Sequence, residues 1–328
     1  MNNILLTFDY ELFFGSNAGT QDKSIISPSN KIATLLKKHN IKATFFIDSG
    51  YLLKLQEFKD SYRKINEDHK QIISQIKFLH EQGHEIQLHI HPHWEDSFYD
   101  GTKWIMDTSR YRLHSFTKEE VEGIVYRYKK VLTDIINEPV FAHRGGGWCI
   151  QPFDHIQEAL KKHNIWLDST LFKNGKNNSK THYFNFKKMP KQESWNFEKN
   201  PLIIEENGFF KEIPISSYKL SPLFFWKLIY FKKFGGAKHK NFGDGSAAGG
   251  SKWDKIRMLT QYTNSVVSMD GYKISFLEKA YKKFLKQKNY KNFVVIAHPK
   301  SMSEYSLEKL ETFILNNKEK NFITYKEI

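Results

Sequence analysis

Apolar runs and helical repeats alternate along the first half of the chain. Runs of apolar residues, or strict alternation of apolar with polar residues, predict strands at 3–8, 42–48, 85–90, 139–144 and 165–168. Apolar residues spaced three or four positions apart predict helices at 28–39, 68–82, 118–136 and 153–163. This rhythm of strand and helix predicts parallel strands with helices packed outside them, which is the α/β class.

The rhythm stops at about residue 172 and resumes after residue 252. Inside this interruption, residues 202–205 and 209–215 predict a hairpin that turns at Asn207-Gly208. After it, the same patterns predict strands at 264–269, 293–296 and 321–325 and helices at 274–288 and 304–316.

Residues 222–234, with the sequence PLFFWKLIYFKKF, predict a helix that is apolar around most of its circumference. Its lysines do not gather on one face, whereas a helix lying on a membrane surface would show one basic face. The pattern therefore favours a helix packed on the domain. The glycine-rich stretch that follows, residues 235–252, predicts a mobile loop, and it lacks the GKS or GKT ending of a phosphate-binding loop.

The chain has 328 residues, of which 40% are hydrophobic, so it can bury a large core. We expect one domain spanning 1–328, with insertions at about 94–116 and 172–252. The single cysteine, Cys149, fits a reducing compartment. We find no secretory signal and no apolar run of the roughly 18 residues that a transmembrane helix needs. These features predict a cytoplasmic protein, with the inner face of the membrane as the other expected location.

The net charge of +14 suggests an anionic partner, such as nucleic acid, an acidic membrane face or a phosphorylated sugar. No zinc-finger spacing or RNA-binding signature accompanies the charge, so we expect no nucleic-acid partner. The lysines are spread along the chain in ones and twos, which makes the charge a weak signal of function.

Four histidines lie between Gly83 and Trp94, in the stretch GHEIQLHIHPHW. Strand alternation places His89 and His91 on one face, and Pro92 predicts a turn that folds His93 back over His89. Neutral imidazole is a common metal ligand, so the cluster predicts a metal site. The alternative is a group of solvated polar residues at the end of a strand.

Other polar residues also follow apolar runs at the ends of predicted strands: Asp9, Glu11, Arg144, Asp168 and His298. The carboxyl ends of parallel strands face the same side of a barrel or sheet, where active sites form. Their coincidence predicts one shared site rather than several separate structural groups.

Five short motifs carry a resemblance to a known family: LTFDYE, HIHPH, RGGGW, DST and IAHP. In this order, across residues 4–299, they resemble the motifs of the polysaccharide deacetylase family, also called the NodB-homology or carbohydrate esterase 4 group. The RGGGW and HPK motifs are similar to the corresponding motifs of deacetylase-like proteins of bacterial O-antigen and capsule biosynthesis. The resemblance implies an α/β fold of distorted seven-stranded (β/α) barrel type, and a divalent ion, usually zinc, held by one acidic residue and two histidines.

The resemblance also implies roles for individual residues. Asp9 matches the general base, Arg144 the residue that orients it, and His298 the general acid. Asp168 matches the aspartate that partners His298. The metal ligands would be Glu11, His89 and His93.

Two departures from the family's pattern leave alternatives open. Glu11 stands one position away from the usual second aspartate of the first motif, so Glu11 or His91 could complete the metal site. The third motif lacks its usual proline. Candidates for contact with the substrate are Tyr10, His91, Gly146 and Trp148.

The expected activity is metal-dependent removal of an N-acyl group, acetyl or formyl, from an amino sugar in bacterial surface-polysaccharide biosynthesis. The substrate would be linked to a nucleotide or to a lipid phosphate, which suits the positive charge of the chain. One alternative is an amidohydrolase acting on a small non-sugar amide, as allantoinase-like enzymes do. Another is a non-catalytic barrel that binds glycans.

Overall fold

The computed structural model describes residues 2–247, 252–287 and 289–328. The chain divides into two compact units. Unit 1 consists of residues 1–43 and 215–328, and unit 2 of residues 44–214. The single domain expected from the sequence stays a prediction. Among the described residues, no helix is both long and apolar enough to cross a membrane.

Unit 2 contains a mostly parallel sheet. Its strands follow the order β10 (Trp195–Phe197), β11 (Phe210–Glu212), β7 (Leu167–Asp168), β6 (Ala142–Gly145), β3 (Glu85–Ile90) and β2 (Thr44–Asp48). Only β10 and β11 pair antiparallel. The register places Asp48 beside His89 and His89 beside Arg144. Polar residues at the carboxyl ends of neighbouring parallel strands therefore lie side by side, as predicted.

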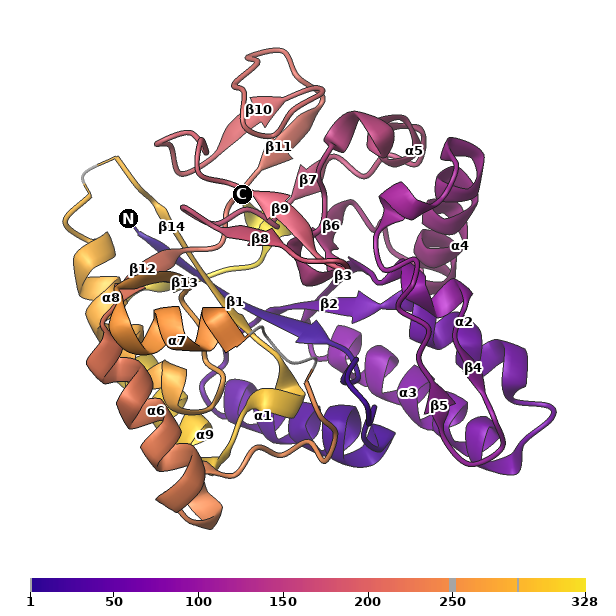
Figure 1. Cartoon of the computed structure of the whole chain (residues 1–328), viewed down its shortest axis with the longest axis horizontal. Coiled ribbons are helices and arrows are strands. Elements are labelled where there is room, and N and C mark those ends of the chain that lie inside the picture. The colour runs from indigo at the N-terminus through magenta and orange to yellow at the C-terminus, as the bar shows by residue number, and fades with distance from the viewer. Residues whose placement is uncertain (1, 248–251, 288) are drawn as a thin grey trace. The chain divides into compact units, whose positions relative to one another are not determined.

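Three helices of unit 2 pack together beside β3 (Figure 1): α2 (Ser49–Phe58), α3 (Arg63–Glu81) and α4 (Lys118–Ile136). The predicted capping box of α4 is present, because the Thr117 side chain accepts from the backbone N–H of Glu120 and the Glu120 carboxylate accepts from that of Thr117. The sequence pattern at 49–58 did not lead to a predicted helix, but the structure forms α2 there. A shorter helix, α5 (Gln157–Lys162), precedes β7.

The hairpin predicted around Asn207-Gly208 is wrong. Strand β11 pairs instead with β10, which places Phe210 opposite Phe197. The rings of these two residues and of Phe153 lie 4.9–5.4 Å apart, centroid to centroid. Burial of three aromatic rings stabilises this pairing more than a favourable turn sequence stabilises a local hairpin. Two small antiparallel ribbons complete the unit, β4 (Phe98–Tyr99) with β5 (Trp104–Ile105) and β8 (Lys176–Asn178) with β9 (Tyr183–Asn185).

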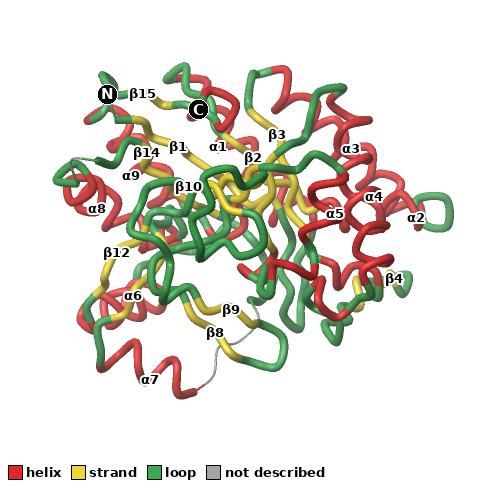
Figure 2. The backbone as a smooth tube through the Cα atoms, turned by 90° about the horizontal axis from the view of Figure 1, so that it is seen from above, coloured by secondary structure: helices red, strands yellow, loops and turns green. Residues whose placement is uncertain are grey.

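Unit 1 is organised around β1 (Asn3–Tyr10), which pairs parallel with β14 (Asn292–Ala297) and β15 (Asn321–Phe322). Figure 2 shows β1 and β14 side by side among helices. These helices include α1 (Ser27–Lys38), α8 (Leu277–Phe284) and α9 (Glu304–Asn316). The register pairs Phe8 with Ala297, so the next residues along the two strands are Asp9 and His298.

The predicted interruption contributes a second substructure to unit 1. Strands β12 (Ser217–Leu220) and β13 (Thr263–Val266) pair antiparallel, and the chain between them forms α6 (Pro222–Phe234) and α7 (Lys252–Thr260). After β13, the backbone N–H of Met269 donates to the carbonyl of Ile296 at 2.9 Å. This bond places the end of the predicted strand 264–269 beside the end of β14.

The glycine-rich segment after α6 is fixed by hydrogen bonds. The backbone N–H of Gly243 donates to the carbonyl of Lys300 at 2.9 Å, and the Asp244 carboxylate accepts from the N–H of Thr20 at 2.7 Å. A Cβ atom at Gly15 would lie 2.2 Å from the carbonyl oxygen of Ser246, so this close approach requires glycine. Residues 235–247 thus differ from the predicted mobile loop, and residues 248–251 lie outside the described residues.

Candidate active site

Two buried imidazoles face each other at the end of β3. The Nδ1 atom of His89 lies 2.8 Å from the carbonyl oxygen of Arg144. A carbonyl can only accept, so Nδ1 carries the proton and the lone pair of His89 is on Nε2. The Nε2 atom of His91 lies 3.1 Å from this atom, and each side chain belongs to a residue that is 2% exposed. A second bond that fixes the tautomer in this way is typical of metal-binding histidines.

The spacing of these nitrogens fits a shared cation. Zinc binds histidine nitrogen at about 2.0–2.1 Å, so two nitrogens on one ion lie about 2.9–3.4 Å apart at angles between 90° and the tetrahedral value. The separation of 3.1 Å lies in this range. The distance between the Nε2 atoms of His89 and His91 is therefore compatible with both nitrogens binding one ion.

The backbone of Gly146 lies directly against His91. A Cβ atom at this position would meet the carbonyl oxygen of Ile90 at 2.5 Å and the Nδ1 atom of His91 at 2.6 Å. The glycine of the RGGGW motif thus leaves room for the imidazole. This contact gives Gly146 a positioning role toward His91, while its predicted contact with substrate stays a prediction.

The substitution Gly146→Ala is expected to lower the free energy of unfolding by about 1–3 kcal/mol, because the added methyl group overpacks the contact with His91. Urea denaturation measures this loss. Gly123→Ala, on helix α4, is the matched control: its Cβ would meet only the end of the flexible Arg127 side chain. That change should raise stability by up to about 1 kcal/mol. Equal stability of the two variants would contradict the tight contact.

The rings of His93 and His91 both contact Tyr111, but in different ring geometries. His93 follows Pro92 in a short 3-10 helix. Its ring stacks on that of Tyr111, with 5.3 Å between centroids and an interplanar angle of 11°. The ring of Tyr111 also contacts that of His182, and the centroids of these two rings lie 4.3 Å apart. The ligand role of His93 stays a prediction. Tyr111 and His182 were not predicted, because they lie in irregular segments without periodicity.

Arg144 and Asp168 belong to a buried polar cluster in unit 2. The Arg144 Nε atom donates to the carbonyl of Ser169 at 2.8 Å, and its guanidinium lies 4.1 Å from the ring centroid of Phe46. Asp168 Oδ2 lies 2.9 Å from His143 Nδ1, which donates to it. Within unit 2 the partner of Asp168 is thus His143, and its predicted pairing with His298 stays a prediction.

Glu212, on β11, joins the same cluster and was not predicted. It is fully buried, and its Oε1 atom accepts from the backbone N–H of Leu171 at 3.1 Å. Burial raises the pKa of Glu212 well above its ordinary value, and the neighbouring charge of Asp168 raises it further. Both effects favour the protonated form of the Glu212 carboxyl group.

In unit 1, His298 is held by Asp270. Its Nδ1 atom lies 3.0 Å from Asp270 Oδ2, and its backbone N–H donates to Asp270 Oδ1 at 2.8 Å. Because Nδ1 donates to Asp270, the Nε2 atom is directed elsewhere, and it lies 3.7 Å from both Asp9 Oδ2 and Glu11 Oε1. Asp270 is thus the aspartate that orients the predicted general acid.

The charges around His298 favour its protonated form. Burial alone would lower the pKa of His298, but Asp270, through its charge and hydrogen bond, and the charges of Glu11 and Asp9 outweigh burial and raise it. The pKa of Asp270 is lowered: burial would raise it, and the interaction with His298 is stronger. The pair is therefore an imidazolium and a carboxylate over a wider pH range than free histidine would allow.

A buried lysine neutralises Glu11. Lys300 is 5% exposed, and its Nζ atom donates to Glu11 Oε1 at 2.9 Å and to the carbonyl of Leu12. The ammonium also lies 4.9 Å from the ring centroids of Phe13 and Phe14. Lys300 belongs to the HPK motif, but the sequence predicted no role for it. In the structure it pairs with Glu11, a predicted metal ligand.

The substitution Lys300→Met is expected to lower the free energy of unfolding by about 3–5 kcal/mol, because it leaves the buried carboxylate of Glu11 without this ammonium. Thermal or urea denaturation measures the effect. The control is Lys286→Met, at an exposed lysine of the same unit, which should change stability by less than about 0.5 kcal/mol. Similar small effects for both variants would show that Lys300 is not an important counter-charge.

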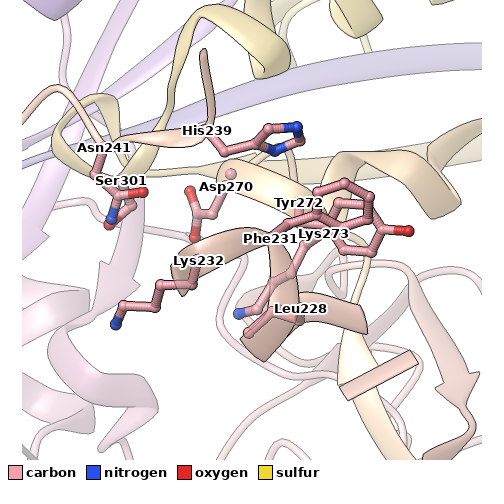
Figure 3. Close-up of a pocket in the computed structure, with 10 residues that line it drawn as sticks. Leu228, Phe231, Lys232, His239, Asn241, Asp270, Tyr272, Lys273 and Ser301 are labelled. Atoms are coloured by element: carbon pink, nitrogen blue, oxygen red, sulfur yellow. The ribbon is translucent and has the colours of Figure 1, made fainter. Parts of the chain in front are cut away.

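Asp270 also lines a pocket of about 200 Å³ within unit 1. Figure 3 shows its carboxylate among side chains from α6, namely Leu228, Phe231 and Lys232, and from the segment that follows Asp270, namely Tyr272 and Lys273. The ring of Phe231 stacks on that of Tyr272 at 4.6 Å. The aspartate that orients His298 therefore borders a space with one aromatic wall and two lysines.

The remaining sequence candidates are mainly packed against protein. Trp148 has a positive φ of 60°, and its ring meets those of Phe172 and Phe184 at 5.3 and 5.9 Å. Tyr10 is 1% exposed, and burial raises its pKa well above the ordinary value. Their contact with substrate stays a prediction. Burial raises the pKa of Cys149 to about 11, so its thiol is protonated at neutral pH and is a poor nucleophile.

Comparison with known proteins relates this arrangement to one family. Residues 2–144 match the model of the family described as polysaccharide deacetylase, and this region includes β1, β3 and most of β6. No curated protein matches the chain by sequence.

Solved structures extend the likeness beyond residue 144. A Mycobacterium smegmatis protein described as a polysaccharide deacetylase is similar over 99% of this chain and 87% of its own, with 13% identity and a TM-score of 0.52. A carbohydrate esterase 4 pseudoenzyme from Bacillus anthracis aligns over 99% of this chain and 64% of its own, with 11% identity and a TM-score of 0.44. The peptidoglycan N-acetylglucosamine deacetylase Bc1960 aligns over 99% of this chain and 86% of its own, with 15% identity and a TM-score of 0.37.

The likeness to the Mycobacterium smegmatis structure confirms the predicted fold class, a mostly parallel α/β fold of the distorted-barrel, NodB-like type. At 13% identity it shows the fold alone. The family comes from the match at residues 2–144, which contains the predicted first and second motifs. Residues 2–144 therefore resemble the polysaccharide deacetylase family.

Proposed function

We propose that the protein is a metal-dependent hydrolase that removes an acetyl or formyl group from the nitrogen of an amino sugar. The observation that carries the proposal is the buried pair of His89 and His91, whose Nε2 atoms lie 3.1 Å apart while Nδ1 of His89 is held by a carbonyl. Two imidazoles oriented in this way are suited to bind a metal ion. The match of residues 2–144 to the polysaccharide deacetylase family supports the type of reaction.

The proposed metal ligands are His89, His91 and the carboxylate of Glu11, all of them buried. Two nitrogen donors and one oxygen donor leave an open position on a four-coordinate ion, as in catalytic zinc sites, so we propose zinc. When bound, zinc would polarise the acyl oxygen and lower the pKa of water toward about 7. Lys300, which donates to Glu11, would keep that carboxylate ionised and oriented.

The proposed proton transfers are assigned to Asp9 and His298. Asp9 would accept a proton from the attacking water, and Arg144 would orient Asp9. His298 would donate the proton on Nε2 to the sugar nitrogen as the carbon–nitrogen bond breaks, so that the sugar leaves as a neutral amine. Asp270 keeps Nδ1 of His298 protonated and stabilises the imidazolium before that transfer.

We propose that the substrate is a precursor of bacterial surface polysaccharide, as the RGGGW and HPK motifs of the O-antigen and capsule branch imply. The net charge of +14 suits a sugar linked to a nucleotide or to a lipid phosphate. Such precursors occur in the cytoplasm and at the inner face of the membrane, and we propose that the protein acts there.

The test combines metal analysis of the purified protein with an assay for acetate or formate. Nucleotide-linked and lipid-linked N-acetyl and N-formyl amino sugars serve as substrates, with and without a chelator. We expect about one equivalent of metal and acyl release that the chelator stops and added zinc restores. A metal-free protein that releases acid from a non-sugar amide would favour the allantoinase-like alternative. Metal and tight sugar binding without any release would favour the non-catalytic alternative.

A further inference from the structure

The outward side of helix α6 carries a stripe of large apolar side chains. Its exposed large side chains are Leu223, Trp226, Ile229, Tyr230 and Phe234, with exposed fractions from 44% to 63%. Their spacing of three or four positions places them along one stripe of the helix. A helix of a soluble domain normally presents charged or polar residues on this face, so the stripe needs an explanation.

The opposite face of α6 fixes its orientation. Phe224 and Phe225 are buried in a cluster that also includes Leu228 and, from α7, Met258 and Leu259. The sequence favoured a helix packed on the domain, and this cluster confirms the packing. The apolar stripe is therefore held outward by a packed core on the other side of the helix.

Helix α7 continues the exposed apolar surface. The indole Nε1 of Trp226 donates to the carbonyl of Leu259 at 3.2 Å, which joins the two helices, and Figure 1 shows them next to each other. On α7, Trp253 is 79% exposed and Ile256 is also exposed. Tyr262, directly after the helix, is exposed as well. We call this set of side chains on α6, α7 and residue 262 the α6–α7 face.

The segment that carries the α6–α7 face is rich in basic residues. Residues 215–262 contain nine lysines and arginines but only two acidic residues, Asp244 and Asp254. Both aspartates have basic partners: Asp254 lies 3.1 Å from Arg257, and Asp244 lies 3.9 Å from Lys23. The exposed apolar residues are therefore set in a region with a strong excess of positive charge.

We propose that the α6–α7 face binds the surface of a membrane that contains anionic phospholipids. Tryptophan and tyrosine favour the boundary between headgroups and acyl chains, and nearby lysines attract anionic headgroups. A protein partner fits less well, because protein interfaces are depleted in lysine. A second copy of the chain would bring two basic faces together, which costs electrostatic energy. The charge of the face thus selects an anionic bilayer as its partner.

Vesicle binding by the full-length protein tests this proposal. The probes are vesicles of phosphatidylcholine with about 30% phosphatidylglycerol and vesicles of phosphatidylcholine alone. We expect binding to the anionic vesicles, with a blue shift of tryptophan fluorescence, and at least tenfold weaker binding to the neutral ones. The triple variant Leu223→Ser, Tyr230→Ser, Trp253→Ser should lose at least tenfold in binding. The charge variant Lys227→Glu, Lys233→Glu should also bind at least tenfold more weakly.

The control replaces three large exposed apolar side chains elsewhere, through Phe98→Ser, Tyr126→Ser and Leu315→Ser. It should bind vesicles as the wild type does, and melting curves should show that all variants are folded. The proposal is overturned if the wild type ignores anionic vesicles, or if either face variant binds them as tightly as the control. It is also overturned if the wild type is a dimer that Trp253→Ser converts to a monomer without any vesicle binding, because a second copy then covers the face.

Discussion

The substitution His89→Ala is expected to remove bound metal and to lower hydrolysis by at least about a thousandfold, because it deletes a proposed ligand. His89 is the imidazole whose tautomer is fixed by the carbonyl of Arg144, so the alternative ligand positions cannot replace it in the same geometry. Metal content by mass spectrometry and acyl release by the same preparation measure the two effects. Melting temperature shows whether the variant is folded.

The same experiment decides between His91 and His93. If His91 is the second imidazole ligand, His91→Ala should lose metal as His89→Ala does, and His93→Ala should keep it while losing the stacking contact with Tyr111. The control is His80→Ala, on the half-buried surface of α3, which should retain metal and activity. Full metal content and activity in His89→Ala would refute the proposed centre, and loss of metal only in His93→Ala would restore the ligand pair predicted from the sequence.

The substitution Asp270→Asn is expected to lower kcat by about 10²–10⁴-fold with little change in KM, because an amide no longer fixes the Nδ1 proton or stabilises the imidazolium of His298. His298→Ala should lose at least as much. Steady-state kinetics on the active substrate measures both values. A simple structural role of Asp270 would instead lower the melting temperature and affect kcat and KM together.

Asp168→Asn is the informative comparison. Its carboxylate accepts from His143, so we expect its main effect on stability, through the loss of a buried charged hydrogen bond. Urea denaturation and kinetics together separate the two aspartates. If Asp168→Asn abolishes kcat in a protein as stable as the wild type while Asp270→Asn is active, the assignment of Asp270 is wrong.

Much of the candidate site could be predicted because its residues stand at the ends of strands. His89, Arg144, Asp168 and His298 each lie at or directly after a predicted strand, and the structure places all four there. Asp270 gave the same kind of signal, since it directly follows the predicted strand 264–269, but nothing local marks which histidine it meets. That choice depends on the hydrogen bond from Met269 to Ile296, which brings this run beside β14.

Other contacts were out of reach for a similar reason. Glu212 reaches the Asp168 cluster because β11 pairs with β7 across a long irregular stretch. Lys300 meets Glu11 although 289 positions separate them in the chain. Tyr111 and His182 lie in segments without periodicity, and only the folded chain stacks them beside His93.

The sequence by itself determined the order and type of most elements and the polar residues that end the strands. These features depend on local periodicity, which can be recognised from residues close together in the sequence. The tertiary structure decided which side chains meet: Asp270 with His298, Asp168 with His143, and His91 with His89. It also decided which stripe of α6 faces outward. Such contacts depend on which strands and helices become neighbours, and no local pattern contains that information.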